Sequence, residues 1–401
     1  MLEENSDVTS NDTFESSYEI KSWDELDINP DILRGVYSHG FERPSPIQQK
    51  AIVPIIQGRD IIAQAQSGTG KTATFSIGAL SLVDLKDNST QILVLSPTRE
   101  LCQQTASVIQ SIGGLMDGLR VKTLFGGTEI EQGSCFSDKH IPHIISGCPG
   151  RVFDMIRREK LSAKGIKLVI LDEADEMLSS GFKDQVYNIF QRLNPNIQVA
   201  LFSATLPEEV LPIVHKIMRN PVKIIVKSEM LTLEGIRQYF VAVDDDRQKY
   251  VTLKHLFSFL SVSQCIIYCN NIKRVTDLYE AMKEDGFPVC CIHRDMNKAE
   301  RENSFKSFRR GENRVLISSN VTARGIDIQQ VSVVINFDLP KCIHTYLHRI
   351  GRSGRWGRKG VGINFITRRD VQKLREVESH YACEIQEMPS DISSLKLSGP
   401  N

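Results

Sequence analysis

The segment VILDEADEML, residues 169–178, places four acidic residues directly after a run of apolar ones. Carboxylates repel one another and are costly to bury beside a hydrophobic core. The run LVILD (168–172) is typical of a strand covered on both faces, and in open α/β sheets ligands bind beyond the carboxyl ends of such strands. The acidic cluster that begins at Asp172 is therefore expected to lie beside a ligand site.

Similar apolar runs recur along the chain and alternate with longer amphipathic segments. Nearly continuous runs of Val, Ile and Leu predict strands of a parallel sheet, and residues 272–284 and 299–309 are expected to be helices between them. The expected strands are DIIAQA (60–65), ILVLS (92–96), HIISG (143–147), LVILD (168–172), VALFSA (199–204), CIIYCN (265–270), VCCIH (289–293), RVLISS (314–319), VSVVINF (331–337) and GINFIT (362–367). The β-α-β pattern thus occurs twice, which predicts an α/β protein of two domains.

Length and local composition give the expected domain boundaries. A chain of 401 residues is longer than a single core usually serves. Residues 1–18 are rich in Ser, Asn, Asp and Glu and are predicted to be a disordered tail. Charged and turn-prone residues around 227–236 predict a linker between a first domain, 19–226, and a second domain, 237–401.

Composition excludes several classes of protein. Neither a signal-peptide core nor an apolar stretch long enough to span a bilayer is present, so a soluble intracellular protein is expected. The 49 basic and 49 acidic residues argue against a surface coated in positive charge, although a local basic groove remains possible. The nine Cys have spacings that suit neither a zinc ribbon nor a disulfide framework, and we interpret most of them as small buried side chains in a reducing compartment.

The segment AQSGTGKT, residues 65–72, follows the first expected strand and precedes a helical pattern. Small residues allow backbone N–H groups to surround a phosphate, Lys71 adds positive charge, and Thr72 is suited to binding Mg²⁺. Ala65 stands where the general P-loop pattern has its first Gly. The alternative is an ordinary strand-to-helix turn, which the strand–loop–helix context makes the weaker reading.

A phosphate loop explains the acidic cluster. Asp172 is expected to hold Mg²⁺, directly or through water, and Glu173 to orient and activate the attacking water. The alternative is an acidic helix N-terminus, which the helix dipole favours without any ligand. That alternative fits Glu176 well, but it explains Asp172 and Asp175 poorly.

Asp-Glu-Ala-Asp, with AQSGTGKT before it and SAT (203–205) after it, resembles the motifs of the DEAD-box RNA helicases. The resemblance extends from residue 23 to about residue 390, and the motifs occur in the same order. It implies two RecA-like domains, each a mostly parallel sheet with helices on both faces. GFERPSPIQ (40–48) resembles the adenine-reading motif of the family, and Trp23 occupies the place of its isolated upstream aromatic residue.

The resemblance implies a role for each matching residue. ATP would be bound by Phe41, Gln48, Ser67, Gly68, Thr69, Gly70, Lys71, Thr72 and Asp327, of which Gln48 faces the adenine edge, Phe41 its ring and Asp327 the ribose. Hydrolysis would depend on Lys71, Thr72, Asp172, Glu173, Arg352 and Arg355, with Mg²⁺ at Thr72 and Asp172. RNA would contact Pro97, Thr98, Arg99, Gly127, Pro149, Gly150, Arg151, Asn270, Arg301 and Ser319. Ser203, Thr205, Asp175 and His348 would couple the two domains.

Elementary chemistry is consistent with two of these assignments. Pro-Gly-Arg at a helix start offers N–H groups and a guanidinium to a phosphate, so Arg151 suits the RNA backbone. Arg352 and Arg355 are one helical turn apart and could reach the same γ-phosphate. The alternative for HRIGRSGRWGRKG (348–360) is a solvated basic loop, because basic clusters are often surface patches.

Within the family the chain most resembles the translation initiation factor 4A group. GRVFDMIRR, LTLEGIRQYFVAV and GRSGRWGRKGV favour the 4A-III type, whereas SGFKDQ (180–185) is closer to the cytoplasmic factor. The resemblance implies single-stranded RNA or short duplexes as ligands, with little sequence preference. It also implies protein partners of the initiation-factor, exon-junction or ribosome-biogenesis kind, a monomer, no membrane, and a place in the nucleus or cytoplasm, with the nucleus slightly favoured.

Four positions depart from the family pattern. Cys148 replaces Thr before Pro-Gly-Arg, Arg294 replaces Gly after His, Lys298 replaces Gln, and Asn320 replaces Asp, with Ser319 in place of a neighbouring Thr. Asn320 keeps an acceptor but loses a charge, so any ion pair there is weakened. None of these changes affects the expected hydrolytic residues.

We therefore predict an ATP-dependent RNA helicase in which ATP and RNA draw the two domains together. One alternative is an ATP-dependent RNA clamp or scaffold with weak turnover, which the change at Asn320 slightly favours. Another is a P-loop ATPase that acts on something other than RNA, and only the motifs after SAT argue against it.

Overall fold

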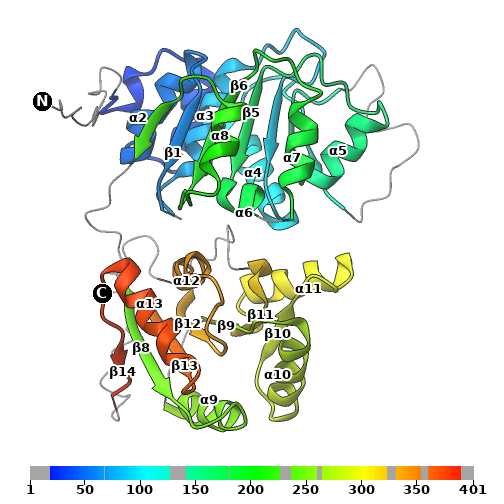
Figure 1. The fold of residues 1–401 in the computed structure, drawn as a ribbon. Coiled ribbons are helices and arrows are strands. Elements are labelled where there is room, and N and C mark those ends of the chain that lie inside the picture. The colour runs from blue at the N-terminus through cyan, green and yellow to red at the C-terminus, as the bar shows by residue number, and fades with distance from the viewer. Residues whose placement is uncertain are drawn as a thin grey trace, which may run out of the picture.

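The protein forms two lobes, each built on its own β-sheet (Figure 1). The computed structural model describes residues 19–66, 68–126, 141–179, 181–225, 236–259, 264–322, 331–353 and 360–389. The predicted tail, 1–18, lies outside these residues. So does the predicted linker, 227–236, except for Ile236, with which strand β8 begins.

The first lobe contains a seven-stranded sheet in the order β3-β4-β2-β5-β6-β1-β7, and its strands pair in parallel. In chain order the strands are β1 (Ile61–Gln64), β2 (Ile92–Leu95), β3 (Val121–Leu124), β4 (Ile144–Gly147), β5 (Leu168–Asp172), β6 (Gln198–Ser203) and β7 (Val222–Ile225). The chain passes from β1 across β6 and β5 to β2, and later returns through β5 and β6 to β7 on the other side of β1. Such changes of direction place ligand sites at the carboxyl ends of the strands.

The second lobe repeats this architecture with a seven-stranded parallel sheet in the order β10-β11-β9-β12-β13-β8-β14. Its strands are β8 (Ile236–Ala242), β9 (Gln264–Tyr268), β10 (Val289–Ile292), β11 (Val315–Ser318), β12 (Val331–Asn336), β13 (Gly360–Ile366) and β14 (Gln386–Glu387). The prediction of two α/β domains is therefore confirmed.

Helices cover both faces of each sheet (Figure 1). The first lobe has the short 3-10 helix η1 (Trp23–Glu25) and α1 (Pro30–Ser38), α2 (Pro46–Ile56), α3 (Lys71–Leu82), α4 (Arg99–Ile112), α5 (Pro149–Arg157), α6 (Ala174–Ser179), α7 (Lys183–Phe190) and α8 (Leu211–Ile217). The second has α9 (Gln248–Phe259), α10 (Ile272–Glu284), α11 (Lys298–Arg309), the 3-10 helix η2 (Asn320–Thr322), α12 (Ile343–Ile350) and α13 (Val371–Tyr381).

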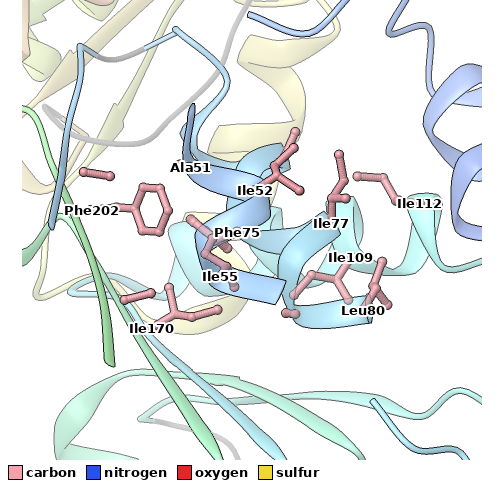
Figure 2. Close-up of a cluster of buried hydrophobic side chains, with 14 of the residues drawn as sticks. Ala51, Ile52, Ile55, Phe75, Ile77, Leu80, Ile109, Ile112, Ile170 and Phe202 are labelled. Atoms are coloured by element: carbon pink, nitrogen blue, oxygen red, sulfur yellow. The ribbon is translucent and has the colours of Figure 1, made fainter. Parts of the chain in front are cut away.

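In the central strands, alternate residues enter two different cores. In β6, Phe202 packs on the side covered by α1–α4, whereas its neighbour Leu201 packs on the side covered by α5–α8. Figure 2 shows the first of these cores, where the rings of Phe75 and Phe202 meet with centroids 5.1 Å apart. Each such fully buried side chain contributes roughly 1.5–3 kcal/mol, so the strands need apolar residues on both faces. That requirement explains the continuous apolar runs in the sequence.

All ten strands that we expected from apolar runs are present, and α10 and α11 occupy the two expected helical ranges. Strand β3, with the sequence VKTL, was not predicted. It lies at the edge of the first sheet, and three of its four residues are partly exposed, so it lacks a continuous apolar run. Strand β14 has only two residues and both are exposed, which leaves no pattern to recognise.

Candidate active site and RNA interface

The phosphate loop connects β1 to α3 as the sequence predicted. Gly68 and Gly70 have φ angles of 86° and 97°, in the left-handed region that favours glycine, and Gly70 caps α3. Lys71, the first residue of α3, is 6% exposed, and its Nζ donates to the carbonyl oxygen of Ala65 at 2.8 Å. The lysine side chain therefore folds back onto the first residue of its own loop, at the carboxyl end of β1.

Two polar side chains of the predicted adenine motif hold this loop from α2. Ser45 Oγ donates to the carbonyl oxygen of Thr69 at 2.7 Å, and Gln48 Nε2 lies 3.5 Å from the carbonyl oxygen of Gly70. Gln48 Oε1 accepts from the backbone N–H of Ser45 at 2.7 Å. The amide of Gln48 thus joins the adenine motif to the phosphate loop, and its second N–H is suited to an adenine acceptor.

The aromatic residues of this region form a small group beside the loop. The ring of Phe41 lies 4.8 Å from that of His39 and 6.5 Å from that of Trp23. Trp23 is completely buried, whereas Phe41 is partly exposed. Trp23 therefore supports Phe41 from within the core, and the exposed part of Phe41 is the surface expected to meet the adenine ring.

The first two residues of the Asp-Glu-Ala-Asp motif occupy a strained, buried position. Asp172 ends β5, and Glu173 has a φ angle of 53°, which is uncommon for a residue other than glycine. Both side chains are 3% exposed. Burial and the neighbouring Glu173 carboxylate raise the pKa of Asp172 above its ordinary value, although the Lys71 ammonium lowers it. The ionised pair therefore needs more positive charge than Lys71 alone provides.

A cavity of about 870 Å³ joins these elements. Its lining includes the predicted ATP-site residues Phe41, Gly68, Gly70, Lys71, Thr72, Asp172 and Glu173. It also includes α4 of the first lobe and the α11 residues Arg301, Glu302, Phe305, Lys306 and Arg309 of the second. Seven residues predicted to bind or hydrolyse ATP thus share one cavity, which α11 of the second lobe also lines.

Asp175 connects the acidic motif to all three of its predicted coupling partners. Its Oδ2 accepts from Thr205 Oγ1 at 2.7 Å, and its backbone N–H donates to Ser203 Oγ at 3.4 Å. The same Oδ2 lies 3.3 Å from Nε2 of His348, which belongs to α12 of the second lobe. The atoms of Glu173, Asp175 and His348 that could bind a metal lie within 4.8 Å of one another. The acidic motif is therefore in direct contact with the second lobe through Asp175 and His348.

Arg352 follows α12 and is 2% exposed. Its Nε donates to the carbonyl oxygen of His348 at 3.1 Å, which fixes the stem of the side chain next to the cross-lobe contact. The predicted site residues Ser67, Gly127, Asp327 and Arg355 lie outside the described part of the chain.

The predicted RNA residues of the first lobe gather around one turn of backbone. Arg99 opens α4, its guanidinium lies 5.1 Å from the ring centre of Phe125, and Nη2 donates to the carbonyl oxygen of Gly126. Arg151 reaches the same turn from α5, with Nε donating to the carbonyl oxygen of Phe125 at 3.3 Å. Thr98 caps α4 by accepting from the N–H of Leu101 at 3.4 Å. Two helix N-termini and two guanidinium groups therefore meet at one edge of the sheet.

Pro97 immediately precedes this cap, and Pro149 is the first residue of α5, where a missing N–H costs no helical hydrogen bond. Gly150 is exposed next to it, so its backbone is accessible to a ligand. The N-termini of α4 and α5 thus present backbone donors suited to phosphate oxygens.

In the second lobe, two predicted RNA residues already have strong protein contacts. Asn270 Nδ2 donates to the carbonyl oxygen of Leu339 at 2.9 Å, and its Oδ1 accepts from Arg349. Arg301 Nη2 donates to Glu100 Oε2 at 2.7 Å, across the two lobes. Ser319, the third, is partly exposed and its backbone N–H donates to Ile292. RNA contacts of these residues remain predictions, and Arg301 additionally joins the lobes.

Comparison with known proteins places this arrangement in a family. The DEAD/DEAH box helicase model matches residues 45–213, and the helicase conserved C-terminal domain model matches residues 248–357. Eukaryotic initiation factor 4A of Caenorhabditis elegans is 48% identical over 390 residues, covering 97% of this chain and 96% of that protein. The chain belongs to the DEAD/DEAH box helicases. It is an ATP-dependent RNA helicase of the initiation factor 4A group.

Other similarities support both the group and the arrangement of the lobes. Eukaryotic initiation factor 4A-III homolog A of Oryza sativa is 49% identical, covering 96% of this chain and 95% of that protein. The structure of S. cerevisiae Dbp5 bound to RNA and ADP BeF3 is 34% identical, with a TM-score of 0.86 over 92% of this chain and 95% of that one. Since that score spans both lobes, the helicase has its lobes arranged much as in that complex.

The structure shows which residue lacks an ionic partner because position 320 is Asn rather than Asp. Asn320 Oδ1 accepts from Nε and Nη2 of Arg349 at 2.9 and 2.6 Å. Arg349 is completely buried, and within the described ranges its other acceptors are Asn336 Oδ1, Asn270 Oδ1 and the carbonyl oxygen of Asp338. Burial lowers the pKa of Arg349 to about 10, so the guanidinium stays charged at neutral pH. A buried cation is thus held by neutral oxygens.

The other departures from the family pattern lie at different places. Cys148 is the N-cap of α5 and its Sγ lies 3.6 Å from Sγ of Cys102. Arg294 is exposed, with Nε 3.4 Å from Asp295 Oδ1. Lys298 begins α11. Cys148 therefore lies directly before the predicted RNA residues Pro149, Gly150 and Arg151 of the first lobe.

Sequence reasoning missed three residues of the helicase that the structure connects to the site. Glu100 is the cross-lobe partner of Arg301, and it directly follows the predicted RNA residues Pro97, Thr98 and Arg99. The Arg349 guanidinium donates to both Asn270 and Asn320, and so connects two of the second-lobe motifs. Ser45 fixes the phosphate loop. Each acts by a contact distant in sequence, which no local spacing indicates.

Across the described residues, no helix has the length and apolar character needed to cross a membrane.

Proposed function

We propose that the helicase hydrolyses ATP in the cavity between its domains and couples each turnover to a change in its grip on RNA. In this proposal the first domain, 19–226, binds ATP, the linker 227–236 acts as the hinge, and the second domain, 237–401, completes the site. The observation that carries it is the shared position of Asp175, which contacts Thr205 in its own lobe and His348 in the other.

The residues present fit a magnesium ion. Carboxylate and hydroxyl oxygens are the ligands that Mg²⁺ prefers. Burial and the neighbouring Glu173 carboxylate raise the pKa of Asp172, so a cation bound there would favour its ionised form. We propose that Thr72 and Asp172 hold the ion, which would neutralise charge on the phosphates. Lys71 reaches the same phosphates from α3.

The chain's own residues supply the rest of the hydrolytic site. Glu173, fixed by its strained backbone beside Asp172, orients the attacking water and accepts its proton. Arg352 lies two residues beyond the end of α12. With Arg355 it would place positive charge at the γ-phosphate only when the domains are together. Ser67 and Thr69 would complete the phosphate loop, and Asp327 would meet the ribose.

RNA is proposed to cross both domains on the side of the α4 and α5 N-termini. Pro97, Thr98, Arg99, Gly127, Pro149, Gly150 and Arg151 would hold it in the first domain, and Asn270, Arg301 and Ser319 in the second. These contacts go to phosphates and sugars, so little sequence preference is expected. The bend imposed by closure would exclude a second strand and open short duplexes.

We propose protein partners of the kind that serve initiation-factor, exon-junction or ribosome-biogenesis assemblies, with the helicase itself a monomer in the nucleus or cytoplasm. Relatives named initiation factor 4A and 4A-III are almost equally identical to this chain, at 48% and 49%. The 4A-III type, and with it the nucleus, rests on the GRVFDMIRR, LTLEGIRQYFVAV and GRSGRWGRKGV segments.

Strand separation tests the proposal against its main alternative. A short RNA duplex with a single-stranded overhang is incubated with the protein and either ATP or a non-hydrolysable analogue. The proposal predicts strand release in both cases, with repeated cycles only in ATP. An RNA clamp, which the neutral contact of Asn320 with Arg349 would favour, would instead keep RNA bound for long periods and consume little ATP. Strand release of duplex DNA equal to that of RNA would contradict the proposal.

A further inference from the structure

Two cysteines connect the helices that carry the RNA motifs of the first domain. Cys102 lies one turn inside α4, and Cys148 is the N-cap of α5. Their Sγ atoms are 3.6 Å apart. Cys102 is completely buried and Cys148 is partly exposed, so one thiol is accessible to a small reagent and the other stands directly behind it.

The backbone around both cysteines is anchored. Strands β2 and β4, which lead into the two helices, pair side by side with Leu95 opposite Gly147. Ser146 Oγ donates to the carbonyl oxygen of Cys102 at 3.0 Å, and the N–H of Cys148 donates to the carbonyl oxygen of Leu124 at 2.8 Å. The two thiols are therefore held facing each other by the sheet, rather than meeting by chance on mobile loops.

We propose that Cys102 and Cys148 form a reversible disulfide under a peroxide oxidant, and that this bond weakens the hold of the first domain on RNA. A disulfide requires an S–S distance of about 2.0 Å, so the sulfur atoms must approach by about 1.6 Å, which side-chain rotation and a small shift of the α5 terminus can supply. The effect on RNA rests on the proposed function, whereas the disulfide itself does not.

The reaction balances with one equivalent of peroxide. The Cys148 thiolate attacks a peroxide oxygen, the O–O bond breaks, and Cys148 becomes a sulfenic acid while hydroxide leaves and is protonated to water. Cys102 sulfur then attacks the Cys148 sulfur, the S–O bond breaks, and a second water forms. Two thiols lose two hydrogens and two electrons, and hydrogen peroxide becomes two waters. A small thiol reductant reverses the change by exchange.

The electrostatics of the pair supports this order of events. Burial raises the pKa of the Cys102 thiol well above its ordinary value, and contact with Cys148 and the negative charges of Asp172 and Glu100 act in the same direction. Cys102 therefore stays protonated at neutral pH and reacts poorly with peroxide directly. It must lose its proton in the second step, so the disulfide is expected to form faster as the pH rises.

The position of Cys148 explains why the bond would matter. Its neighbours Pro149, Gly150 and Arg151 form the first turn of α5, the turn proposed to hold a phosphate. Drawing the N-cap toward α4 shifts these N–H groups and the Arg151 guanidinium away from the arrangement described above. Loss of one charge-assisted hydrogen bond to a phosphate corresponds to roughly tenfold weaker binding.

The experiment treats the reduced, full-length protein with hydrogen peroxide and maps its peptides by mass spectrometry without reduction. We expect a Cys102–Cys148 linked peptide, two hydrogens lighter than the sum of its parts, and about tenfold weaker binding of single-stranded RNA with a non-hydrolysable ATP analogue. A thiol reductant should restore binding. Cys102→Ala should retain its RNA affinity after peroxide, whereas Cys342→Ser, which removes an exposed thiol of the second domain, should lose it as the wild type does.

Each failure has a separate meaning. Unlinked Cys102 and Cys148 peptides in a wild-type protein whose other cysteines have been oxidised would overturn the disulfide. A linked protein with unchanged RNA affinity, or equal losses in wild type and Cys102→Ala, would overturn its effect on RNA. A reduced protein that never binds RNA would count against the proposed function, and the peptide map would still decide the disulfide. If Cys102→Ala does not fold, the wild-type map and its reversal by reductant remain decisive.

Discussion

Glu173 is the single residue on which hydrolysis should depend most. We expect Glu173→Gln to retain ATP binding, because Lys71 and the phosphate loop are unchanged, and to lower turnover by about 10²–10⁴-fold, since it removes the general base. Equilibrium nucleotide binding and steady-state phosphate release measure the two effects. Glu176→Gln is the matched control, because it makes the same chemical change in a residue outside the lining of the cavity. Normal turnover in Glu173→Gln would disprove the assignment.

Asn320 offers a second test at the same scale. Asn320→Asp gives the buried Arg349 guanidinium an ionic partner in place of a neutral one, and should stabilise the protein by about 1–2 kcal/mol, with a few degrees in Tm. It should also increase the stimulation of ATPase activity by RNA. Asn196→Asp is the control, because Asn196, exposed like Asn320, also accepts from an arginine. That arginine, Arg219, is exposed rather than buried, and ion pairs there contribute little. Equal effects of the two substitutions would show that burial is not the cause.

The phosphate loop and the adenine motif behave as one element. A Cβ added at Gly70 would lie 2.6 Å from Gln48 Nε2, and the φ angle of 97° is strained for any side chain. We expect Gly70→Ala to weaken ATP binding by more than about tenfold, because it displaces Gln48 and distorts the loop at once. Gly118→Ala separates the two causes, since Gly118 has a φ angle of 80° with open space around its Cβ position. The control should lose some stability but bind ATP normally, and a similar loss of ATP binding in both variants would be incompatible with this account.

The sequence predicted the elements that bury continuous apolar runs and the loops whose residues share a local pattern. The strands through Leu171 and Ile267, and the loop around Lys71, belong to this class. It did not predict β3, whose Lys122 and Thr123 suit an edge strand with little apolar area. A continuous apolar run indicates a strand that is buried on both faces. An edge strand such as β3 is too little buried to have such a run, so the sequence does not reveal it.

Contacts between distant segments were beyond sequence reasoning for a different reason. The pairing of Glu100 with Arg301 spans 201 positions and unites two domains, so no spacing rule connects them. The arginine hub at Arg349 was missed because its neighbours are Asn and carbonyl groups, which carry no charge pattern. The resemblance to a family supplied the positions of the motifs, and only the fold shows which of them touch.

For the molecule as a whole, closure should depend on the Glu100–Arg301 pair. The two side chains are 9% and 13% exposed and their closest atoms are 2.6 Å apart, so each single charge reversal leaves two like charges in a poorly hydrated contact. We expect Glu100→Arg or Arg301→Glu alone to raise the RNA concentration needed for half-maximal ATPase stimulation by about tenfold or more. The double reversal should recover part of the loss. Distances between dyes attached to the two domains measure closure. With RNA and ATP bound, we expect them to be shortest in the wild type, longer in the double reversal and longest in the single variants.

Failure of the double reversal to improve on either single variant would show that the two residues act separately. In that case the RNA contact predicted for Arg301 would account for its effect, and Glu100 would act through its place in the lining of the cavity that Asp172 shares.

The most direct test of the account is ATP turnover by the pure protein with and without single-stranded RNA, at low and moderate salt. We predict strong stimulation by RNA that declines as salt increases, because closure needs both ligands and RNA is held mainly through its phosphates. Turnover that is the same with and without RNA at both salt concentrations would contradict the claim that RNA completes the hydrolytic site by drawing the two domains together.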